Sequence, residues 1–570
     1  MTTPAYDLVV RGGTIVDGSG GPPFVGDVAA AAGRIAAVGE VPGAGREEID
    51  ATGRVVTPGF VDLHTHYDGH VTWGSRLQPS SAHGVTTVVT GNCGVGFAPC
   101  KPEGRASLVK LMEGVEDIPE VVMTEGLPWE WQSFPDYLDF LARRRFDVDV
   151  ATQLPHAPLR VYVMGERALD KAPASVDDVA RMRALVAEGI RAGALGFSTS
   201  RSLNHRASDG TVTPSHAAAG DELAGIARGL RDAGAGVLQL ISDFADVDAE
   251  FAIVRRMLAE SGRPLSLSVI QMPNAPRRWA EILDRVEGAG AEGLPILGQV
   301  CGRPIGVLLG LELSVHPFSA CAGHRELSGA SFADRLAALR DPVRRARILA
   351  EFPGEWTRPI GHVVTRFENL FLMTDPPDYE PPPAAAIAAL AAAAGVTPQA
   401  LAYDHLIAGD GRNVIYLPSA NYEGHSIAAI ERMLSSRYTV SGLGDGGAHC
   451  GLICDASLTT YALLRWSDAR GGPTPLATVV RALSHDTARA VGLNDRGRIA
   501  GGMKADLNVI DLARLTLHRP AMCFDLPAGG GRLGQLASGY DATVVAGAVT
   551  YRNGEATGAL PGRLVRSARA

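Results

Sequence analysis

The sequence predicts an α/β protein, a TIM-type (β/α)8 barrel with a small composite β-sandwich formed by both termini. Two observations predict this class. In the middle of the 570-residue chain, eight short apolar runs alternate with helical patterns, which is typical of a parallel sheet with crossover helices. At both ends, short runs of alternating apolar and polar residues are separated by glycines, which is typical of small β-structures.

The two ends of the chain are predicted to build one sandwich. Residues 1–58 form its first part, an antiparallel unit, with strands expected at Asp7–Arg11, Thr14–Val16, Asp27–Ala31, Arg34–Val38 and Glu48–Asp50. Residues 493–570 form its second part and a C-terminal tail, with strands expected at Leu507–Asp511, Ala542–Ala546 and Ala548–Tyr551. Asn553 and Gly554 follow as a hairpin-type turn. Two separate β-modules, one at each end, are the alternative.

Residues 59–492 are predicted to form the barrel. The stretch 302–437 is too long for a single crossover, so we interpret it as an insertion that forms a lid or a wall of the substrate pocket. The chemistry of such barrels is located at the carboxyl ends of the strands. The eight expected strands are Gly59–His66, Val85–Thr90, Asp149–Pro155, Leu195–Ser200, Gly236–Ser242, Leu265–Gln271, Pro295–Cys301 and Tyr438–Asp445.

Composition excludes several classes of protein. With 53 Lys+Arg, 62 Asp+Glu and a net charge of −9, the chain has no basic run of the kind that binds nucleic acid. No stretch approaches the ~18 consecutive apolar residues of a membrane span, and the N-terminus lacks the basic and apolar regions of a signal peptide. Seven cysteines, an odd number, do not form a disulfide framework. We therefore expect a cytoplasmic protein with reduced thiols.

The first barrel strand ends in two histidines. In a strand, residues i and i+2 face the same way, so Asp62, His64 and His66 all point into the barrel. Two imidazoles at the exit of a strand are half of a divalent-metal site, because neutral histidine nitrogen suits Zn²⁺ and related ions. The alternative is that one of the two is a buried, hydrogen-bonded core histidine.

Two further residues follow barrel strands. Asp445 ends the eighth strand in the run Ser441-Gly-Leu-Gly-Asp-Gly-Gly-Ala-His, where an aspartate can bind a metal, take a proton from a water, or both. An Asp-Gly pair otherwise marks a turn. Cys93 stands in Gly-Asn-Cys-Gly directly after the second strand, and a thiolate is a strong Zn²⁺ ligand. A lone cysteine is otherwise an inert buried residue.

Together these motifs resemble the amidohydrolase superfamily, and more narrowly its N-acyl-D-amino-acid deacylase (D-aminoacylase) branch. The motifs are the β-rich start, Thr57-Pro-Gly-Phe-Val-Asp-Leu-His-Thr-His-Tyr-Asp-Gly, the Gly-Asn-Cys-Gly turn and the segment from Asp445 to His449. The resemblance covers nearly the whole chain. It implies metal-assisted hydrolysis of an amide other than an ordinary peptide bond. It also implies that His64, His66 and Cys93 bind metal, and that Asp445 is the catalytic acid/base. From the remaining set of donors we expect Asp445 to be a metal ligand as well.

The sequence departs from the family at the second metal position. Relatives usually carry a histidine at the ends of strands 5 and 6, where strand order places Gln239 and Gln271 here. A lysine bridge between two metals on strand 4 is excluded as well, because no lysine lies on a predicted strand. We therefore expect one tight divalent ion, Zn²⁺, with a second ion weak or absent. A non-catalytic relative with a degraded metal site is the alternative. The four lysines are Lys101, Lys110, Lys171 and Lys504.

The substrate is less closely defined. The branch holds a substrate carboxylate with a basic residue after the strand-8 aspartate, and no arginine follows Asp445 here. We expect a small-molecule amide contacted by Arg201, Gln239, Gln271 and His449. A cyclic amide, an imide or a lactone is the alternative, since the same water can attack any of these carbonyl carbons. The preference for D or L substrates and the choice between a monomer and a homo-oligomer stay open.

Overall fold

The computed structural model describes residues 5–356 and 360–567. The outermost parts of the two predicted terminal segments, 1–4 and 568–570, lie outside the described residues, and so does most of the N-terminal stretch examined for a signal peptide. Within the described ranges, no helix is long and apolar enough to cross a membrane. The seven cysteines carry free thiols.

Each of the eight predicted barrel runs contains a parallel strand, and the third run contains two. The strands form two parallel sheets, a three-stranded one in the order β6-β7-β8 and a six-stranded one in the order β9-β10-β11-β12-β13-β17. Their order in space therefore follows their order in the chain. Their bounds are β6 Phe60–Asp62, β7 Val85–Thr90, β8 Asp149–Thr152, β9 Leu154–Pro155, β10 Gly196–Arg201, β11 Val237–Ser242, β12 Leu265–Ser268, β13 Ile296–Val300 and β17 Thr439–Ser441.

Backbone hydrogen bonds connect the two sheets at both edges. On one side, the amide of Leu195 donates to Thr152 O at 2.8 Å, just before β10 and at the end of β8. On the other side, His66 N donates to Gly446 O at 2.8 Å and Asp445 N donates to His64 O at 3.1 Å. The second pair of bonds brings the segments after the first and the eighth strand side by side.

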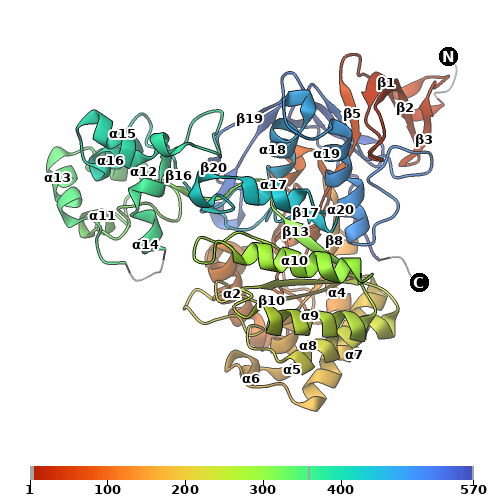
Figure 1. The fold of residues 1–570 in the computed structure, drawn as a ribbon, viewed down its shortest axis with the longest axis horizontal. Helices are drawn as coiled ribbons and strands as arrows, with labels where there is room; N and C mark the ends of the chain where they lie inside the picture. Colours follow the sequence, from red (N-terminus) through yellow and green to blue (C-terminus); the bar gives the residue numbers. More distant parts are fainter. Residues whose placement is uncertain (1–4, 357–359, 568–570) are drawn as a thin grey trace.

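Helices cover the outer face of the six-stranded sheet (Figure 1). Helix α7 shows why these segments are helical: Ser175 and Asp178 form a capping box, and Met182, Val186 and Ile190, spaced four residues apart, form the buried stripe. The helices that follow these strands are α7 Val176–Ala192, α8 Gly220–Ala233, α9 Val247–Ser261, α10 Arg278–Ala291 and α17 Ala428–Leu434. Further helices between or after the parallel strands are α2 Arg105–Glu116, α4 Phe134–Ala142, α5 His156–Met164, α18 Leu458–Arg465, α19 Leu476–Leu483 and α20 His485–Ala490.

The two ends of the chain meet in one nine-stranded sheet. Its strand order is β25-β24-β23-β18-β5-β1-β2-β3, with β4 pairing β1, so the predicted joining of both termini is confirmed and two separate modules are wrong. The expectation of a purely antiparallel N-terminal unit is also wrong, because β4 and β5 both run parallel to β1. A second, facing layer, as in a sandwich, stays a prediction. The bounds are β1 Tyr6–Ile15, β2 Phe24–Ala31, β3 Arg34–Gly39, β4 Gly45–Asp50, β5 Val55–Pro58, β18 Leu507–Ile510, β23 Tyr540–Val545, β24 Ala548–Arg552 and β25 Glu555–Ala556.

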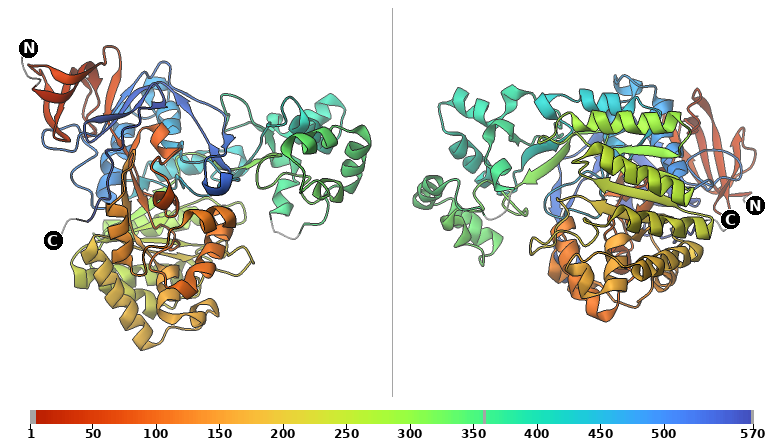
Figure 2. Two further views of the ribbon diagram at one scale, coloured as in Figure 1. Left: turned by 180° about the vertical axis from the view of Figure 1, so that it is seen from behind. Right: turned by 60° about the horizontal axis from the view of Figure 1, so that its bottom comes forward.

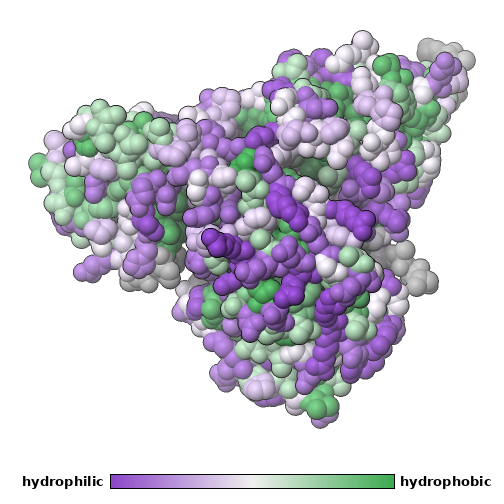
Figure 3. Space-filling view, in the orientation of Figure 1, coloured by the Kyte–Doolittle hydropathy of each residue, from purple (hydrophilic) through white to green (hydrophobic). Residues whose placement is uncertain are grey.

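The insertion projects sideways as a lobe with an apolar core of its own (Figures 1 and 2). In the space-filling view a notch separates it from the helices below (Figure 3). Its base contacts the loop after β17, where Leu308 N donates to Leu452 O at 2.7 Å and Ser314 N donates to Gly451 O at 3.1 Å. A role as lid or pocket wall stays a prediction. Its main elements are β14 Ile305–Leu309, α12 Phe332–Leu339, α13 Pro342–Glu351, β15 Phe371–Leu372, α15 Ile387–Ala394, α16 Pro398–Ile407 and β16 Ile415–Ala420.

The C-terminal strand β18 supplies part of the core of the terminal sheet, and this can be tested. Leu507 is fully buried there, so Leu507→Ala should lower the free energy of unfolding by about 2–5 kcal/mol through lost burial and a cavity. The matched control is Leu536→Ala, because Leu536 is 60% exposed and its loss should change stability by less than about 0.5 kcal/mol. Equal urea midpoints for the two variants would contradict the placement of β18.

Candidate metal and active site

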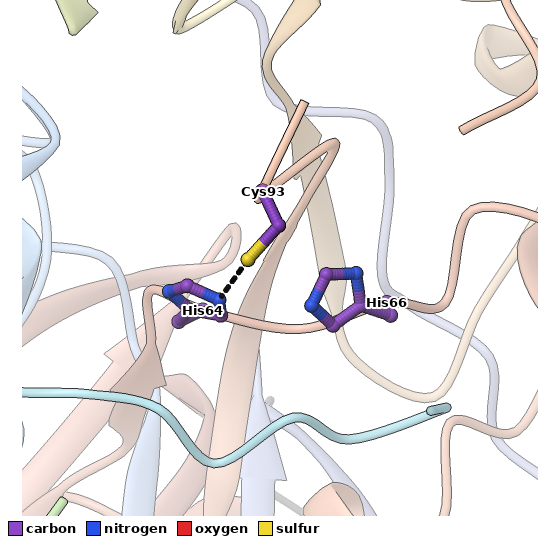
Figure 4. A group of neighbouring side chains, drawn as sticks. All are labelled: His64, His66 and Cys93. Carbon is purple, nitrogen blue, oxygen red and sulfur yellow. Dashed lines mark hydrogen bonds between the residues drawn. The ribbon is translucent and has the colours of Figure 1, made fainter. Parts of the chain in front are cut away.

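His64 and His66 lie directly after β6, where the strand leaves the sheet. Backbone bonds to both neighbouring strand ends hold this segment: Thr65 N donates to Val89 O at 3.0 Å, and His66 N donates to Gly446 O. Both imidazoles are buried, and one nitrogen of each lies with Cys93 Sγ in a group whose atoms are all within 4.8 Å of one another. Figure 4 shows the three side chains converging from the two strand ends.

Cys93 reaches this point because its turn has an unusual backbone. Gly91 and Gly94 have φ angles of +73° and +68°, and a Cβ at Gly91 would lie 2.1 Å from Gln153 O. Cys93 itself has a φ of +55°, a left-handed conformation that non-glycine residues rarely adopt. Asp445 and His449 also have left-handed backbone conformations, with φ angles of +46° and +51°. Such strain clusters at functional sites, because the surrounding structure must hold it in place.

A neighbouring amide decides which nitrogen of His64 faces the site. Gln299 Nε2 donates to Ser266 Oγ at 2.8 Å, which leaves its Oε1 to accept from His64 Nδ1 at 2.6 Å. With the proton on Nδ1, the lone pair of Nε2 points toward Cys93 Sγ, 3.2 Å away. This tautomer is the one in which Nε2 can bind a metal ion.

Asp445 completes the group. Its Oδ1 lies 3.4 Å from His64 Nε2 and 3.7 Å from His66 Nε2, and this oxygen is buried without a hydrogen-bond partner among the described residues. The carboxylate as a whole is 24% exposed, so it faces both the imidazoles and the mouth of the site. The predicted set of His64, His66, Cys93 and Asp445 is thus brought together in space. Two nitrogens, a sulfur and an oxygen at such distances are a donor set that fits Zn²⁺.

Burial sets the protonation of these groups. It raises the pKa of Asp445 to about 6, although His449 lowers it, and it lowers the pKa of His64 to about 4. Burial, together with nearby Asp445, raises the pKa of the Cys93 thiol well above its ordinary value. At neutral pH the metal-free site therefore has neutral imidazoles, a thiol and an ionised aspartate. A bound cation would favour the thiolate, so its binding would release a proton.

The two glutamines have other partners. Gln239 Oε1 accepts from Cys93 N at 2.9 Å, and Gln271 Oε1 accepts from Glu423 N at 3.2 Å. Both amide oxygens, the atoms that could have bound a second ion, are thus directed to backbone amides. Gln239 instead supports the Cys93 turn, while its Nε2 is buried without a hydrogen-bond partner among the described residues.

The other predicted substrate residues are spread over the mouth. Arg201 ends β10, and its Nε and Nη2 donate to Glu250 while its Nη1 donates to Ala218 O, so three of its five N–H donors are in use. His449 lies next to the metal-binding group, with Nε2 4.0 Å from Glu116 Oε2. Substrate contact by either residue stays a prediction.

Sequence reasoning missed two residues of the site. His205 follows β10 by four residues, its Nδ1 contacts Ser200 Oγ at 2.8 Å, and burial lowers its pKa to about 4. The signal that could have found it is a histidine in the loop after the fourth expected strand, Leu195–Ser200. Glu116 ends α2 with its side chain buried beside His66. The sequence feature that could have revealed Glu116 is an acidic residue at an apolar position. Glu116 continues the four-residue spacing of the buried Leu108 and Met112.

A narrow cavity of about 20 Å³ lies beside Asp445. Its wall contains Gly446, Gly447, His70 and Arg532, and Arg532 Nη1 is buried without a hydrogen-bond partner among the described residues. A volume of this size holds about one ordered water, which is too little for a substrate.

Comparison with known proteins identifies the family. Residues 47–551 match the sequence model of the amidohydrolase family. The chain belongs to the amidohydrolase family. Two curated relatives of this amidohydrolase come from Alcaligenes xylosoxydans xylosoxydans: a D-aminoacylase, 36% identical over 195 residues, and an N-acyl-D-aspartate deacylase, 37% identical over 246 residues. These matches cover 34% and 42% of this chain, and they span less than half of the relatives, 37% and 44% of their lengths.

Solved structures share the fold of this amidohydrolase. An N-acyl-D-glutamate deacylase from Bordetella bronchiseptica, solved with zinc and a phosphonate that mimics the tetrahedral intermediate, aligns with a TM-score of 0.64. The alignment covers 98% of this chain and 99% of that one at 23% identity. The resemblance to the deacylase branch that the sequence motifs indicated is confirmed at the level of fold and family.

The raised pKa of Asp445 predicts a pH-dependent cost in the metal-free amidohydrolase. With a folded pKa of about 6 instead of 3.8, the carboxyl holds its proton more tightly in the folded state, so stability falls as pH rises through this interval. At about 1.4 kcal/mol per pKa unit, Asp445→Asn should raise the free energy of unfolding at pH 8 by up to about 3 kcal/mol. Near pH 4 it should change little. Urea unfolding of chelator-treated protein measures both, and equal gains at the two pH values would contradict it.

Proposed function

We propose that this amidohydrolase is a metal-dependent hydrolase of amide bonds other than ordinary peptide bonds, acting on N-acyl amino acids. The observation that carries the proposal is the convergence of His64, His66, Cys93 and Asp445 at one buried point. We also propose that the two parallel sheets close into a (β/α)8 barrel and that the terminal sheet is one layer of a sandwich. Both proposals are supported by the hydrogen bonds at the two sheet edges and by the sheet built from both termini.

The residues divide the chemistry between them. His64 Nε2, His66 Nε2, Cys93 Sγ and Asp445 Oδ1 would hold a divalent ion, which supplies Lewis-acid polarisation of a carbonyl and activation of water at neutral pH. Asp445 has a second role as acid and base: with a pKa of about 6, it is ionised at neutral pH and can accept a proton from water. The same carboxyl can then return that proton to the leaving nitrogen.

The substrate class is supported by the relatives that the chain resembles, whose names are D-aminoacylase, N-acyl-D-aspartate deacylase and N-acyl-D-glutamate deacylase. A panel of N-acyl-D- and N-acyl-L-amino acids, cyclic amides and lactones tests it with Zn²⁺, Mn²⁺ or Co²⁺ added. Turnover of N-acyl amino acids only in the presence of metal supports the proposal. Turnover restricted to cyclic amides or lactones would move the activity to those substrates. No turnover with any metal would favour a binding protein.

The role of Asp445 can be separated from metal binding. Asp445→Asn should lower kcat by at least about 100-fold, because general acid–base catalysis contributes this much, while His64, His66 and Cys93 retain the ion. The control is Asp243→Asn: Asp243 accepts from Ser202 Oγ and Leu203 N in a neighbouring loop and should leave kcat within a few-fold. A fully active Asp445→Asn variant would end the proposal.

The number of bound ions is a second test. Because the amide oxygens of Gln239 and Gln271 accept from backbone amides, we propose one tight ion per chain. Elemental analysis of protein purified without added metal should give about one ion, and two tightly held ions would contradict it. The double variant Gln239→His with Gln271→His restores imidazoles at these positions and should bind a second ion more tightly than the wild type does.

A further inference from the structure

We propose that Glu116 is a positioning residue whose buried carboxylate orients His66 for metal binding and fixes the segment that carries His449. The inference rests on the proposed function, because it concerns the same ion. It adds a residue from outside the barrel strands, on the last turn of α2, to the residues that shape the site.

Helix α2 is placed so that its end points into the site. Leu108, Met112 and Val115 form its buried stripe, which packs into the main apolar core. Glu116 lies on the continuation of that stripe, four residues after Met112, and its side chain is only 2% exposed. The helix stops there, since Asp117 adopts a left-handed φ of +53°. The apolar face of α2 thus ends in a buried carboxyl group, and burial, together with nearby Asp445, raises the pKa of that carboxyl well above its ordinary value.

The carboxylate lies between two histidines. Glu116 Oε1 is 3.2 Å from His66 Nδ1, and Oε2 is 4.0 Å from His449 Nε2. The backbone of Glu116 is also engaged, because its carbonyl oxygen accepts from His449 N. Among the described residues, these histidines are the only ion-pair partners of Glu116, and no lysine or arginine pairs with it.

A carboxylate buried without a lysine or arginine is costly, so its position needs a compensating interaction. In this structure Glu116 Oε2 and His66 Nδ1 both lack an aligned hydrogen bond among the described residues. The imidazole of His66 and the carboxyl group of Glu116 therefore lie at ion-pair distance without a well-aligned hydrogen bond between them. A proton on His66 Nδ1 directed to the carboxylate satisfies Glu116 and leaves the lone pair on Nε2, the nitrogen that is 3.7 Å from Asp445 Oδ1.

The two metal-facing histidines thereby have unequal partners. His64 Nδ1 contacts the neutral amide of Gln299, whereas His66 Nδ1 contacts a carboxylate. A carboxylate partner raises the donor strength of an imidazole more than an amide does, in addition to fixing its tautomer and ring orientation. The geometry thus makes His66 the stronger ligand of the pair and makes its strength depend on Glu116.

The end of α2 also restrains the loop after β17. Asp117 Oδ2 accepts from Gly451 N at 2.9 Å and from Ser314 Oγ at 2.7 Å, two residues beyond the contact of Glu116 with His449. Adjacent acidic residues therefore hold the loop that contains Asp445 and His449. Glu116 also contacts a metal-facing imidazole, that of His66.

The experiment compares Glu116→Gln and Glu116→Ala with a matched control, Glu222→Gln. Glu222 is another buried carboxylate beside a histidine, 3.1 Å from His156 Nε2 and 2.6 Å from Arg160 Nε, and it contacts none of the metal-facing residues. Zn²⁺ affinity of the full-length protein is measured by competition with a chromophoric chelator, and the visible spectrum of the Co²⁺ form is recorded. Neither measurement requires substrate.

Glu116→Ala should lower Zn²⁺ affinity about 10–100-fold and alter the Co²⁺ spectrum, and Glu116→Gln, which keeps an acceptor but not the charge, should lie between it and the wild type. Glu222→Gln should lower thermal stability but leave affinity and spectrum unchanged. Unchanged affinity and spectrum in both Glu116 variants would overturn the inference, as would an equal loss in Glu222→Gln. If Glu116→Ala fails to fold, the isosteric Glu116→Gln decides. A wild type that binds no ion would overturn the proposed function and this inference together.

Discussion

The proposed active site of this protein depends on the contact between the segments that follow β6 and β17. Two backbone hydrogen bonds, from His66 N to Gly446 O and from Asp445 N to His64 O, hold these segments together. Since each bond starts or ends at a site residue, the same bonds that join the sheets also fix the distance between the imidazoles and the carboxylate. The second strand adds Cys93 through a glycine-flanked turn. The roles proposed for these four residues all depend on the meeting of these strand ends.

The site also concentrates polar groups that the rest of the protein does not satisfy. Asp445 Oδ1, Glu116 Oε2, His66 Nδ1 and Gln239 Nε2 are buried without hydrogen-bond partners among the described residues. Buried polar atoms are normally paired, and the unpaired Asp445 Oδ1 faces Nε2 of both histidines, an arrangement that fits a site for a cation. Because its position is fixed, the binding of a cation would need little reorganisation. The free-energy cost of burying these four unpaired polar atoms is offset by the stability of the surrounding sheets and of the apolar core that contains residues of α2.

Residue patterns predicted much of this arrangement. Alternation of apolar runs and helices placed a parallel strand in each of the eight expected runs, and period-two geometry placed His64 and His66 on one side of the chain. Contacts between side chains that lie far apart in the sequence were not predictable. Gln299 and Glu116 contact the two histidines across 235 and 50 residues of chain, and nothing local to either residue encodes that contact. The parallel pairing of β4 and β5 with β1 was missed for the same reason, because sheet neighbours are set by the return path of the chain.

The terminal sheet has a consequence for how the molecule is made. β5 precedes the two parallel sheets and β18 follows them, and Asn508 in β18 donates to Pro58 O across 450 residues. During synthesis the edge of β5 that pairs with β18 therefore stays unpaired until β18 has left the ribosome, which is after most of the polypeptide has been made. A pairing of such long range forms slowly, and an exposed strand edge invites wrong partners. Conditions that stall translation between β5 and β18 should thus yield aggregation-prone fragments rather than folded ones.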